Sequence, residues 1–593
     1  MPVVIDVRPS PEELASAVRT SLCLEPSDIM FINASIIDVW RREIVEGIEI
    51  AVRGRIISCV GRCARSRGSS TKIIDLRGSI VSPGFIDVHT HIESTFLRPS
   101  EFSKAIISRG TTAVFADPHE IANVAGFEGL RYMANELSKT PLKAFLLIPP
   151  NVPASLRAPE VGGALLRYDE VIDMINHFSG VGEVMDIGSL LDGDERFIEY
   201  ASKLSMARIV QGHAAGLSGE DLDVYASLAI GNDHEVTEWG ELIERLSKGI
   251  IPIVRYGSSW RDLERLYRAI QDYSPLIPVA TDDIHALHIL REGHLDRAVR
   301  RAIELGVDPV KAIASVTLAP ALLYGMHRWM GSIAPGRYAD LVIIEDLDRV
   351  RIKDVYIDGV LVASGYRYIA LLQEDSSEIP SSVSNTVKII WPPKISLEIQ
   401  RNCREALVRV IKPIHGTTLT KEGREVISCG VDVVKENSNS KLLYVTSINR
   451  YGVSRSYTAL LEGIELDGAI ASTVSHDSHN IIAVGSSLDD IMTAVKAIVD
   501  SGGGISLAFR GRVEALVELG VAGLMSRKRY LEVVDDLDKL FRALEERGFE
   551  KPEDILLEIQ LLSLTVIPEI RITDRGLYLV SKREVASLVI SYS

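Results

Sequence analysis

The strongest constraint on the fold is a long middle segment, residues 81–330, in which short apolar runs alternate with amphipathic stretches. The runs include TTAVFAD, LKAFLLIPP, GVGEVMDI and ARIVQGHA, and stretches such as GFEGLRYMANELSK lie between them. The apolar spacing of HLDRAVRRAIELG is helical, and Asp308 and Pro309 before VKAIASV are typical of a helix start. Strands alternating with helices over about 250 residues predict a parallel (β/α)8 barrel.

The segments that flank this middle part have a different texture. Residues 1–80 and 331–370 contain short apolar runs broken by glycine and polar residues, which predicts hairpins. We expect the two pieces to pair into one composite small β-sandwich domain, with the barrel of residues 81–330 inserted between them. The serine- and glutamate-rich composition of residues 366–384 predicts a linker, and residues 385–593 mix strands and helices as a separate C-terminal α/β domain.

Charge and cysteine content exclude several classes of protein. A net charge of −16 argues against a nucleic-acid groove, which needs a basic surface. The scattered cysteines form no C-x-x-C pair, so we expect neither a disulfide framework nor a thiolate zinc site, and a reducing cytoplasmic location. They are Cys23, Cys59, Cys63, Cys403 and Cys429.

The chain gives no sign of a membrane partner. Its N-terminus lacks the apolar core of a signal peptide, and no run approaches the roughly 20 apolar residues of a membrane-spanning helix. We expect a soluble cytoplasmic protein that acts on a small molecule and, at 593 residues, assembles as a homo-oligomer.

Two histidines, His89 and His91, end the first apolar run of the barrel segment, in PGFIDVHTHIEST. Alternate residues of a strand face the same side, so both imidazoles point the same way, toward the mouth where barrel active sites are built. Two core histidines bonded to the backbone are the simpler alternative. The H-x-H pattern at a strand end nevertheless favours metal ligation, because two imidazoles on one face can share one divalent ion.

Further potential ligands follow later apolar runs, and any one of them alone could be a solvated loop residue. They are Glu183, His213, His234 and Asp282. Together with the strand end that carries His89 and His91, these make five polar strand ends in chain order over the length of a barrel, which are hard to explain as solvated loops. Four histidines and two carboxylates without thiolate suit two divalent ions, Mn, Fe or Zn, that share a water molecule.

These motifs make the sequence recognisable. VSPGFIDVHTHIEST resembles the first-strand signature of the amidohydrolase superfamily, and GSIAPGRYADLVIIE is similar to the strands that return to its small β-sandwich. Nearly the whole chain resembles the bacterial and archaeal adenine deaminase family, through GTTAVFADPHEIANVAG, GVGEVMD, GHAAGLSG, NDHE, TDDIHALHILREGHLD and SHDSHNIIAVG. The resemblance implies hydrolytic deamination of adenine to hypoxanthine and ammonia by a metal-bridged hydroxide, with Mn or Fe favoured.

The resemblance also implies roles for the ligands. His89 and His91 would hold one ion, and His213 and His234 would hold the other. Glu183 would bridge the two ions, in the place where many relatives have a carboxylated lysine. Asp282 would bind metal and carry the proton of the attacking hydroxide to the departing ammonia, so Asp282 and Glu183 are the expected catalytic residues. The adjacent Asp283 could exchange places with Asp282, and TDDIH lacks the basic residue expected after the second aspartate.

Five other polar residues are candidates for contact with the purine base. The simpler alternatives are a His–Glu pair that only caps a loop, in FADPHEIANVAG, and an ordinary turn, in SHDSHN. The five candidates are His119, Glu120, Asp283, His476 and His479. Among the remaining histidines, we expect His285, His288 and His294 to support the ligands or to face solvent. We expect His177, His327 and His415 to be structural.

Two rival functions remain at this point. Another amidohydrolase, acting on a cyclic amide such as a hydantoin or a dihydropyrimidine, would share the metal cage but open a ring instead of releasing ammonia. A silent scaffold that binds purine or metal is disfavoured by the intact ligand set. The H-x-E and P-C-x-x-C signature of nucleic-acid deaminases is absent, as are H-E-x-x-H and the P-loop pattern.

Overall fold

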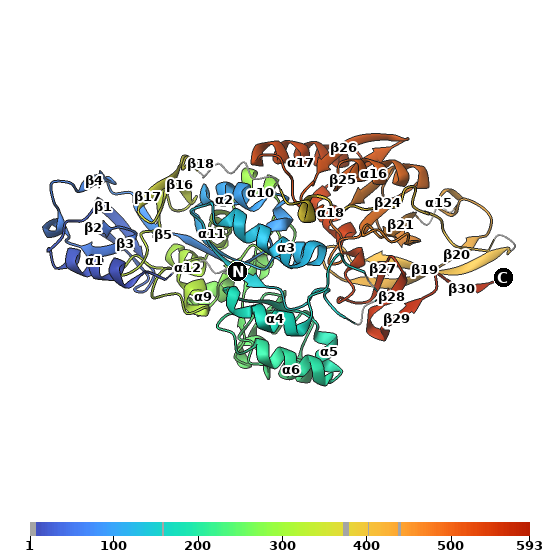
Figure 1. Ribbon diagram of the computed structural model, residues 1–593, viewed down its shortest axis with the longest axis horizontal. Coiled ribbons are helices and arrows are strands. Elements are labelled where there is room, and N and C mark those ends of the chain that lie inside the picture. The colour runs from blue at the N-terminus through green and yellow to red at the C-terminus, as the bar shows by residue number, and fades with distance from the viewer. Residues whose placement is uncertain (1–7, 157–158, 160, 372–378, 401–402, 437–440) are drawn as a thin grey trace.

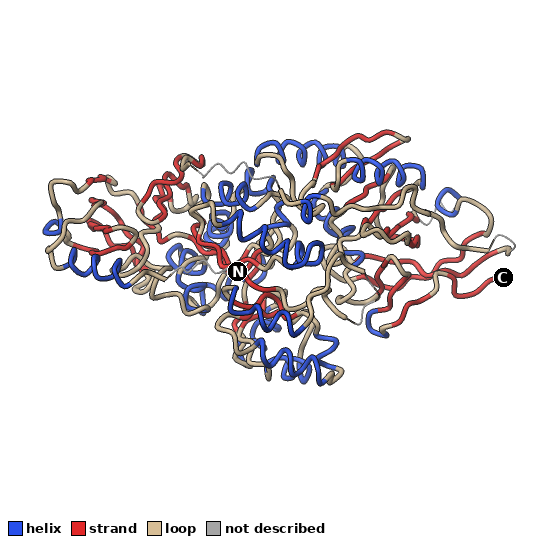
Figure 2. The backbone as a smooth tube through the Cα atoms, viewed as in Figure 1, coloured by secondary structure: helices blue, strands red, loops and turns tan. Residues whose placement is uncertain are grey.

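The computed structural model describes residues 8–156, 159, 161–371, 379–400, 403–436 and 441–593. The N-terminal strands lie at one end of the molecule, the helix-rich middle segment at its centre and the C-terminal segment at the other end (Figure 1). Figure 2 shows strands gathered at both ends and helices around the centre. Within the described residues, no helix combines the length and apolar character needed to cross a membrane.

One sheet combines strands from the two segments that flank the barrel in sequence. Antiparallel pairing of β5 with β15, which places Ser82 opposite Val342, joins them. Both segments contribute to one core, in which the Phe31 and Tyr356 rings meet edge to face with centroids 5.0 Å apart. The elements are α1 (Pro11–Ser21), β1 (Ile29–Asp38), β2 (Glu43–Arg53), β3 (Ile56–Gly61), β4 (Lys72–Asp75), β5 (Ile80–Pro83), β15 (Leu341–Asp346), β16 (Arg351–Ile357), β17 (Val360–Ser364) and β18 (Arg367–Tyr368).

The middle segment forms the closed ring of parallel strands that the alternating pattern predicts. The ring strands are β6 (Phe85–Thr90), β7 (Thr111–Ala116), β8 (Lys143–Ile148), β9 (Gly180–Val184), β10 (Val210–Gly212), β11 (Asn232–Asp233), β12 (Ile251–Pro252) continued by β13 (Val254–Arg255), and β14 (Val279–Ala280). β6 to β10 pair in chain order, β11 pairs with β12, and β13 pairs with β14. The ring closes where the Asp282 N–H donates to the His89 carbonyl and the His91 N–H donates to the Asp282 carbonyl. The carboxyl ends of all these strands therefore share one mouth.

Helices cover the outside of the ring. They are α2 (Pro99–Ile107), α3 (His119–Leu137), α4 (Tyr168–Met174), α5 (Ile187–Leu191), α6 (Glu195–Leu204), α7 (Gly219–Ala226), α8 (Trp239–Ser247), α9 (Leu263–Tyr273), α10 (Ala286–Arg291), α11 (Leu295–Glu304), α12 (Pro309–Ser315) and α13 (Leu318–Leu323). As predicted, Asp308 caps α12: its carboxylate accepts the Val310 and Lys311 N–H groups, and Pro309 occupies the first turn. Proline fits there because the first N–H groups of a helix have no partner within it.

The C-terminal segment is a mixed sheet covered by helices. Its main sheet contains β19 (Glu405–Pro413), β20 (Thr420–Ser428), β21 (Leu442–Ile448), β22 (Ser456–Glu462), β23 (Ala469–Ser472), β24 (Ile481–Gly485), β25 (Gly504–Phe509), β26 (Arg512–Glu518) and β30 (Val589–Tyr592). The remaining elements are α15 (Val433–Glu436), α16 (Leu488–Asp500), α17 (Tyr530–Glu545), α18 (Pro552–Gln560) and a small sheet of β27 (Ile570–Thr573), β28 (Gly576–Leu579) and β29 (Glu584–Ala586).

The expected linker is only partly within the structure. Residues 372–378 lie outside the described residues. On one side of them β18 ends at Tyr368, and on the other α14 (Ser381–Ser384) packs into the protein. Val383 is fully buried, and its carbonyl accepts the Ala522 N–H at 2.6 Å. The second half of this stretch is therefore anchored to the C-terminal segment.

The expectation that the cysteines form no disulfide framework is wrong. Cys59 and Cys63 are disulfide-bonded, as are Cys403 and Cys429. Cys403 precedes β19 and Cys429 follows β20, and the antiparallel register of these strands brings the two Cα atoms to 5.6 Å, within disulfide reach. Sequence spacing does not reveal a strand register, so this pairing was not visible. The cysteines consequently give no support to a reducing compartment.

Candidate metal centre and its pocket

The six predicted ligands converge at the mouth of the barrel. Each lies at or just beyond the carboxyl end of a ring strand, so the parallel order of the ring turns all six side chains toward one space. All are largely shielded from solvent, and the most exposed, His213, has 13% of its side-chain surface accessible. The predicted ligands are His89, His91, Glu183, His213, His234 and Asp282.

The Glu183 carboxylate lies between the two histidine pairs. Its Oε1 is 3.1 Å from His89 Nε2 and 3.0 Å from His91 Nε2. Its Oε2 is 2.8 Å from His213 Nδ1 and 3.9 Å from His234 Nε2. One carboxylate thus faces both pairs with different oxygens, which is the arrangement of a bridging ligand.

The hydrogen bonds behind the first histidine pair fit a metal centre. His89 Nδ1 lies 2.8 Å from Gln211 Oε1, and His91 Nδ1 lies 3.0 Å from the Asp117 carbonyl oxygen. Both oxygens only accept, so each Nδ1 carries the proton and each Nε2 turns a lone pair toward Glu183. This is the tautomer that a histidine ligand needs.

Orphaned buried atoms give a second test of fit. His89 Nε2, Glu183 Oε1 and His213 Nδ1 are buried, and none makes a hydrogen bond with any described residue. A buried polar atom without a partner costs about 1–3 kcal/mol, and a cation among these atoms removes that cost. The residues present fit a divalent metal centre.

The charges in the cage favour cations. Burial opposes the charged form of His89, but the neighbouring Asp282 and Glu183 carboxylates outweigh it and raise the pKa of this imidazole to about 10. Burial also opposes ionisation of Glu183, yet the imidazoles around it, His234 and His213 foremost, hold the pKa of this carboxyl well below its usual range. Two ionised carboxylates therefore face the imidazoles, and divalent cations neutralise them.

The structure separates the adjacent aspartates that the sequence could not. Asp282 Oδ1 lies 3.3 Å from both His89 Nε2 and His91 Nε2. Its backbone has φ 56°, a left-handed conformation that costs energy in a non-glycine residue and is concentrated at functional sites. The Asp283 carboxylate instead accepts a hydrogen bond from the Ser94 hydroxyl. Asp282 is thus the aspartate that faces the cage.

Several residues that hold the ligands in place were missed at the level of sequence. Asp117 Oδ2 accepts the Glu183 N–H at 2.7 Å, and a Cβ on Gly182 would clash with that carboxylate. Asp87 Oδ2 accepts the Thr281 hydroxyl at 2.6 Å. Asp87 lies two residues before His89, so strand periodicity offered a signal for it.

Arg255 is a further missed residue, at the end of β13. Its Nη1 lies 3.3 Å from Asp282 Oδ2, and its Nε lies 2.9 Å from Asp262 Oδ2. The guanidinium is buried, and its plane of donors holds the Asp282 carboxylate from the side away from the histidines. Sequence gave no signal for it beyond its place after an apolar run.

The expected substrate contacts form a second polar cluster beside the cage. Glu120, in the first turn of α3, has Oε1 2.6 Å from His476 Nδ1. Its Oε2 contacts His479 Nε2. The His119 ring packs against that of His91, with centroids 4.6 Å apart. The C-terminal SHDSHN loop therefore reaches the barrel mouth.

His285, His288 and His294 are buried, so the solvent-facing alternative is wrong for them. His294 Nε2 lies 3.3 Å from Asp87 Oδ2, which links it to the strand that bears His89. His177, His327 and His415 are not part of the cage: His415 Nδ1, for example, lies 2.8 Å from Glu558 Oε2 on α18.

A small cavity of about 70 Å³ lies above the cage. Its floor is formed by the predicted ligands other than His89 and by His119, Glu120, Asp283 and His476. Its apolar wall comes from the barrel loop and from the C-terminal segment: Trp260, Leu561, Leu564, Val566 and Ile567. A flat apolar body with polar edges fits these surfaces.

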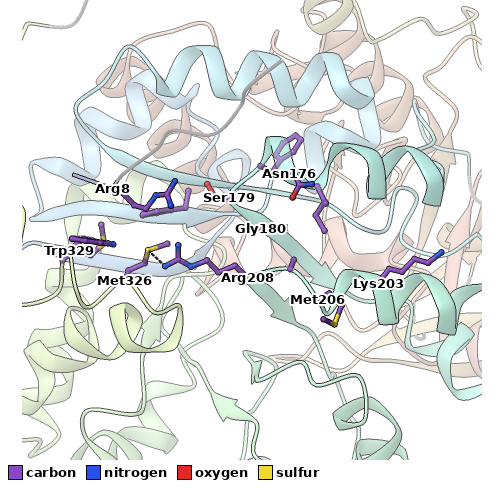
Figure 3. Close-up of a pocket in the computed structure, with 14 residues that line it drawn as sticks. Arg8, Asn176, Ser179, Gly180, Lys203, Met206, Arg208, Met326 and Trp329 are labelled. Atoms are coloured by element: carbon purple, nitrogen blue, oxygen red, sulfur yellow. Dashed lines mark hydrogen bonds between the residues drawn. The ribbon is translucent and has the colours of Figure 1, made fainter. Parts of the chain in front are cut away.

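A larger cavity of about 460 Å³ lies at the other end of the barrel strands. Figure 3 shows Met206, Met326 and Trp329 with the cationic Arg8 and Arg208 around it. Its described lining contains no carboxylate and no imidazole, so it offers no metal ligands. The chemistry therefore belongs to the smaller cavity.

Comparisons with known proteins agree with this geometry. Residues 80–362 match the model of the Amidohydrolase family, and residues 417–584 match the Adenine deaminase C-terminal domain. A protein of Kosmotoga olearia named adenine deaminase is 36% identical over 576 residues, which cover 95% of this chain and 97% of that protein. The chain belongs to the adenine deaminase family. The family predicted from the sequence motifs is confirmed.

Other relatives of the same name extend this likeness to an archaeon and to another bacterium. The adenine deaminase of Staphylothermus marinus is 33% identical over 596 residues and covers 98% of both chains. That of Clostridium botulinum is 32% identical over 584 residues, covering 95% of this chain and 96% of its own. The adenine deaminase family likeness thus spans the barrel and the C-terminal segment together.

Solved structures that align with the chain are more distant. An adenosine deaminase from Xanthomonas campestris with bound zinc aligns with 58% of this chain and 95% of its own, at 16% identity and a TM-score of 0.44. An N-acetylglucosamine-6-phosphate deacetylase from Pasteurella multocida aligns with 56% of this chain and 98% of its own, at 14% identity and a TM-score of 0.43.

Proposed function

We propose that this protein hydrolyses adenine to hypoxanthine and ammonia with a divalent metal centre. The observation that carries the proposal is the convergence of four imidazoles and two carboxylates beneath a small apolar cavity. The full-length relatives named adenine deaminase identify the reaction. Hydrolysis of a cyclic amide is not favoured, because these relatives match at least 95% of this chain under one name.

The proposed centre holds two ions. Nitrogen and oxygen donors without thiolate suit Mn, Fe or Zn, and the resemblance to the family favours Mn or Fe. When bound, such ions lower the pKa of a coordinated water from 15.7 to about 7, so hydroxide is present at neutral pH. The proposed ligands are His89 and His91 for one ion, His213 and His234 for the other, Glu183 between them, and Asp282.

The proton transfers fall to Asp282. In the overall reaction, the oxygen of water bonds to C6 of adenine, the bond from C6 to the amino nitrogen breaks, and ammonia leaves. Asp282 Oδ1, which faces the cage, accepts a proton from the attacking water and donates it to the departing amino group. Arg255, 3.3 Å from Asp282 Oδ2, keeps the carboxylate oriented during both transfers.

The base is proposed to lie between the cage and the apolar wall. His119, Glu120, Asp283, His476 and His479 are the proposed polar contacts or their supports. The cavity is small, about 70 Å³, and Leu564, Ile567 and Trp260 help to close it, so it has no room for a ribose in addition to the base. Adenosine is therefore expected to be a poor substrate.

The test is an ammonia-release assay with adenine, adenosine and guanine, with Mn(II) or Fe(II) supplied anaerobically. We expect turnover of adenine alone and its loss in His89→Ala. A matched control is His415→Ala, which removes a histidine that is outside the cage and has 54% of its side chain exposed. Comparable activity on all three substrates, or ring opening of a dihydropyrimidine without ammonia, would contradict the proposal.

Three further proposals concern organisation. The domain bounds are residues 1–80 with 331–370, residues 81–330, and residues 385–593, and the pairing of β5 with β15 supports the first of them. A cytoplasmic location is supported by the purine-base substrate. A homo-oligomeric state is supported by the size of the chain, and light scattering on the purified protein tests it.

A further inference from the structure

A carboxylate of the barrel is held by an imidazole of the C-terminal segment. Glu120 follows β7, and His479 lies in the loop between β23 and β24, 359 residues later. Their side chains are 3% and 0% exposed. The two meet beside the cavity above the cage, so residues from two distant parts of the chain share one polar contact at the site.

The backbone of the loop fixes the direction of this hydrogen bond. The Ser475 N–H donates to His479 Nδ1 at 3.2 Å. A ring nitrogen accepts only when it carries no proton, so the neutral His479 ring has its proton on Nε2. Nε2 therefore donates, and the Glu120 carboxylate accepts.

The same hydrogen bond decides against a third metal ion. Glu120, His476 and His479 lie close enough to bind one. A metal at His479 Nε2 would need a lone pair there and a proton on Nδ1, given to an acceptor, as His89 gives its Nδ1 proton to Gln211 Oε1. At His479 the Nδ1 partner is itself a donor, Ser475. The cluster is consequently a hydrogen-bonded clamp.

The loop that bears His479 is built for one conformation. The His479 N–H donates to the Ser475 carbonyl at 2.7 Å, and its backbone has φ 50°, in the left-handed region. The Ser475 hydroxyl lies 2.6 Å from that of Ser563, which also donates to the His476 carbonyl at 3.0 Å. Such strain persists only where the surroundings determine the geometry.

We infer that His479 is a positioning residue for adenine deamination: it aims Glu120 at the ring N–H on the imidazole edge of the purine base. This inference rests on the proposed function, and it explains how the site would select a free base over a nucleoside. Glu120 lines the cavity, and its Oε1 also faces His119 Nε2 at 3.5 Å. In a nucleoside the sugar replaces the N9 proton. Glu120 Oε1, which also lies 2.6 Å from His476 Nδ1, then loses the donor from the base and faces the sugar instead, which disfavours the nucleoside.

The experiment compares three substitutions in the full-length, metal-loaded protein. His479→Leu removes both hydrogen bonds. His479→Asn keeps an acceptor for Ser475 but is too short to reach Glu120. His479→Gln places an N–H group near the position of Nε2. The measurements are kcat and KM for adenine, the affinity for adenine by calorimetry, metal content and thermal unfolding.

We expect the Leu and Asn variants to lose about 10–100-fold in kcat/KM for adenine, the size expected for one charge-assisted hydrogen bond. The Gln variant is expected to recover most of that loss, and all variants to keep the metal content of the wild type. Wild-type kcat/KM in His479→Asn would overturn the inference, as would loss of one metal equivalent. If the wild type itself releases no ammonia from adenine, the proposed function has failed, which is a separate outcome. In that case the affinity for adenine, measured by calorimetry, still tests the clamp.

Discussion

Gln211 sets the tautomer of His89, a proposed metal ligand, and its removal gives the sharpest test of the centre. Its Oε1 lies 2.8 Å from His89 Nδ1, while its Nε2 donates to the Val88 carbonyl at 2.9 Å. In Gln211→Leu the His89 Nδ1–H is buried without an acceptor, which costs about 1–3 kcal/mol. The ring regains a partner by moving its proton to Nε2 and turning it toward Glu183, and that proton must leave before an ion binds. We expect metal affinity to fall by about 10–100-fold, the usual effect of losing such a support.

The assay is competition with a chromogenic chelator at constant pH, with metal content followed per chain. Gln400→Leu is the matched control, because Gln400 is exposed and does not line the cavity above the cage. The weakened affinity should belong to the ion that His89 binds, and excess Mn(II) should restore ammonia release. Equal chelator midpoints for Gln211→Leu and Gln400→Leu would refute the claim that His89 is a ligand oriented by Gln211.

Two more predictions concern stability and the cavity wall. Arg571 is fully buried, and its guanidinium donates to the Thr418, Leu561, Ile567 and Pro568 carbonyls, which lie in or beside the wall of the cavity. Arg571→Met should lower the free energy of unfolding, measured with denaturant, by at least about 3 kcal/mol, because several buried carbonyls lose their donor. It should also raise KM for adenine. An equal effect of Arg575→Met, at an exposed arginine, would contradict this. A hydrogen bond from Arg55 lowers the pKa of Glu13 to about 2 from its ordinary 4.5, so the stability that the charged pair provides is present above pH 4.5 and is lost as the pH falls through about 2. The melting temperature of Glu13→Gln should therefore lie below that of the wild type at pH 7 and converge with it in strong acid, and a gap that does not change with pH would exclude the pair as its cause.

The barrel and the meeting of the six candidate ligands at its mouth could be predicted because both are encoded in short stretches of sequence. The candidate ligands lie at or just after the ends of several ring strands, as His89 and His91 do at β6, and parallel closure then brings those ends together. What could not be predicted depends on register or on long-range packing. The Cys403–Cys429 bond needs the alignment of β19 with β20.

The supports of the site show the same limit. The contact between Glu120 and His479 joins residues 359 positions apart, and no local pattern encodes it. Gln211 lies two residues before His213, yet a glutamine near a strand end has no distinctive signature. Arg571 is a buried cation that binds carbonyls in place of a carboxylate, so charge pairing could not reveal it.

The sheet shared by both flanks of the barrel has a consequence for how the chain is made. β5 ends at Pro83, but its neighbour β15 begins only at Leu341, after the whole ring of strands has been synthesised. At about 5–20 residues per second, a ribosome needs on the order of ten seconds or more to deliver that partner. During this interval one edge of the first strands lacks its neighbour, and the hydrogen bonds that finally cover β5 also bring the two ends of the barrel segment together.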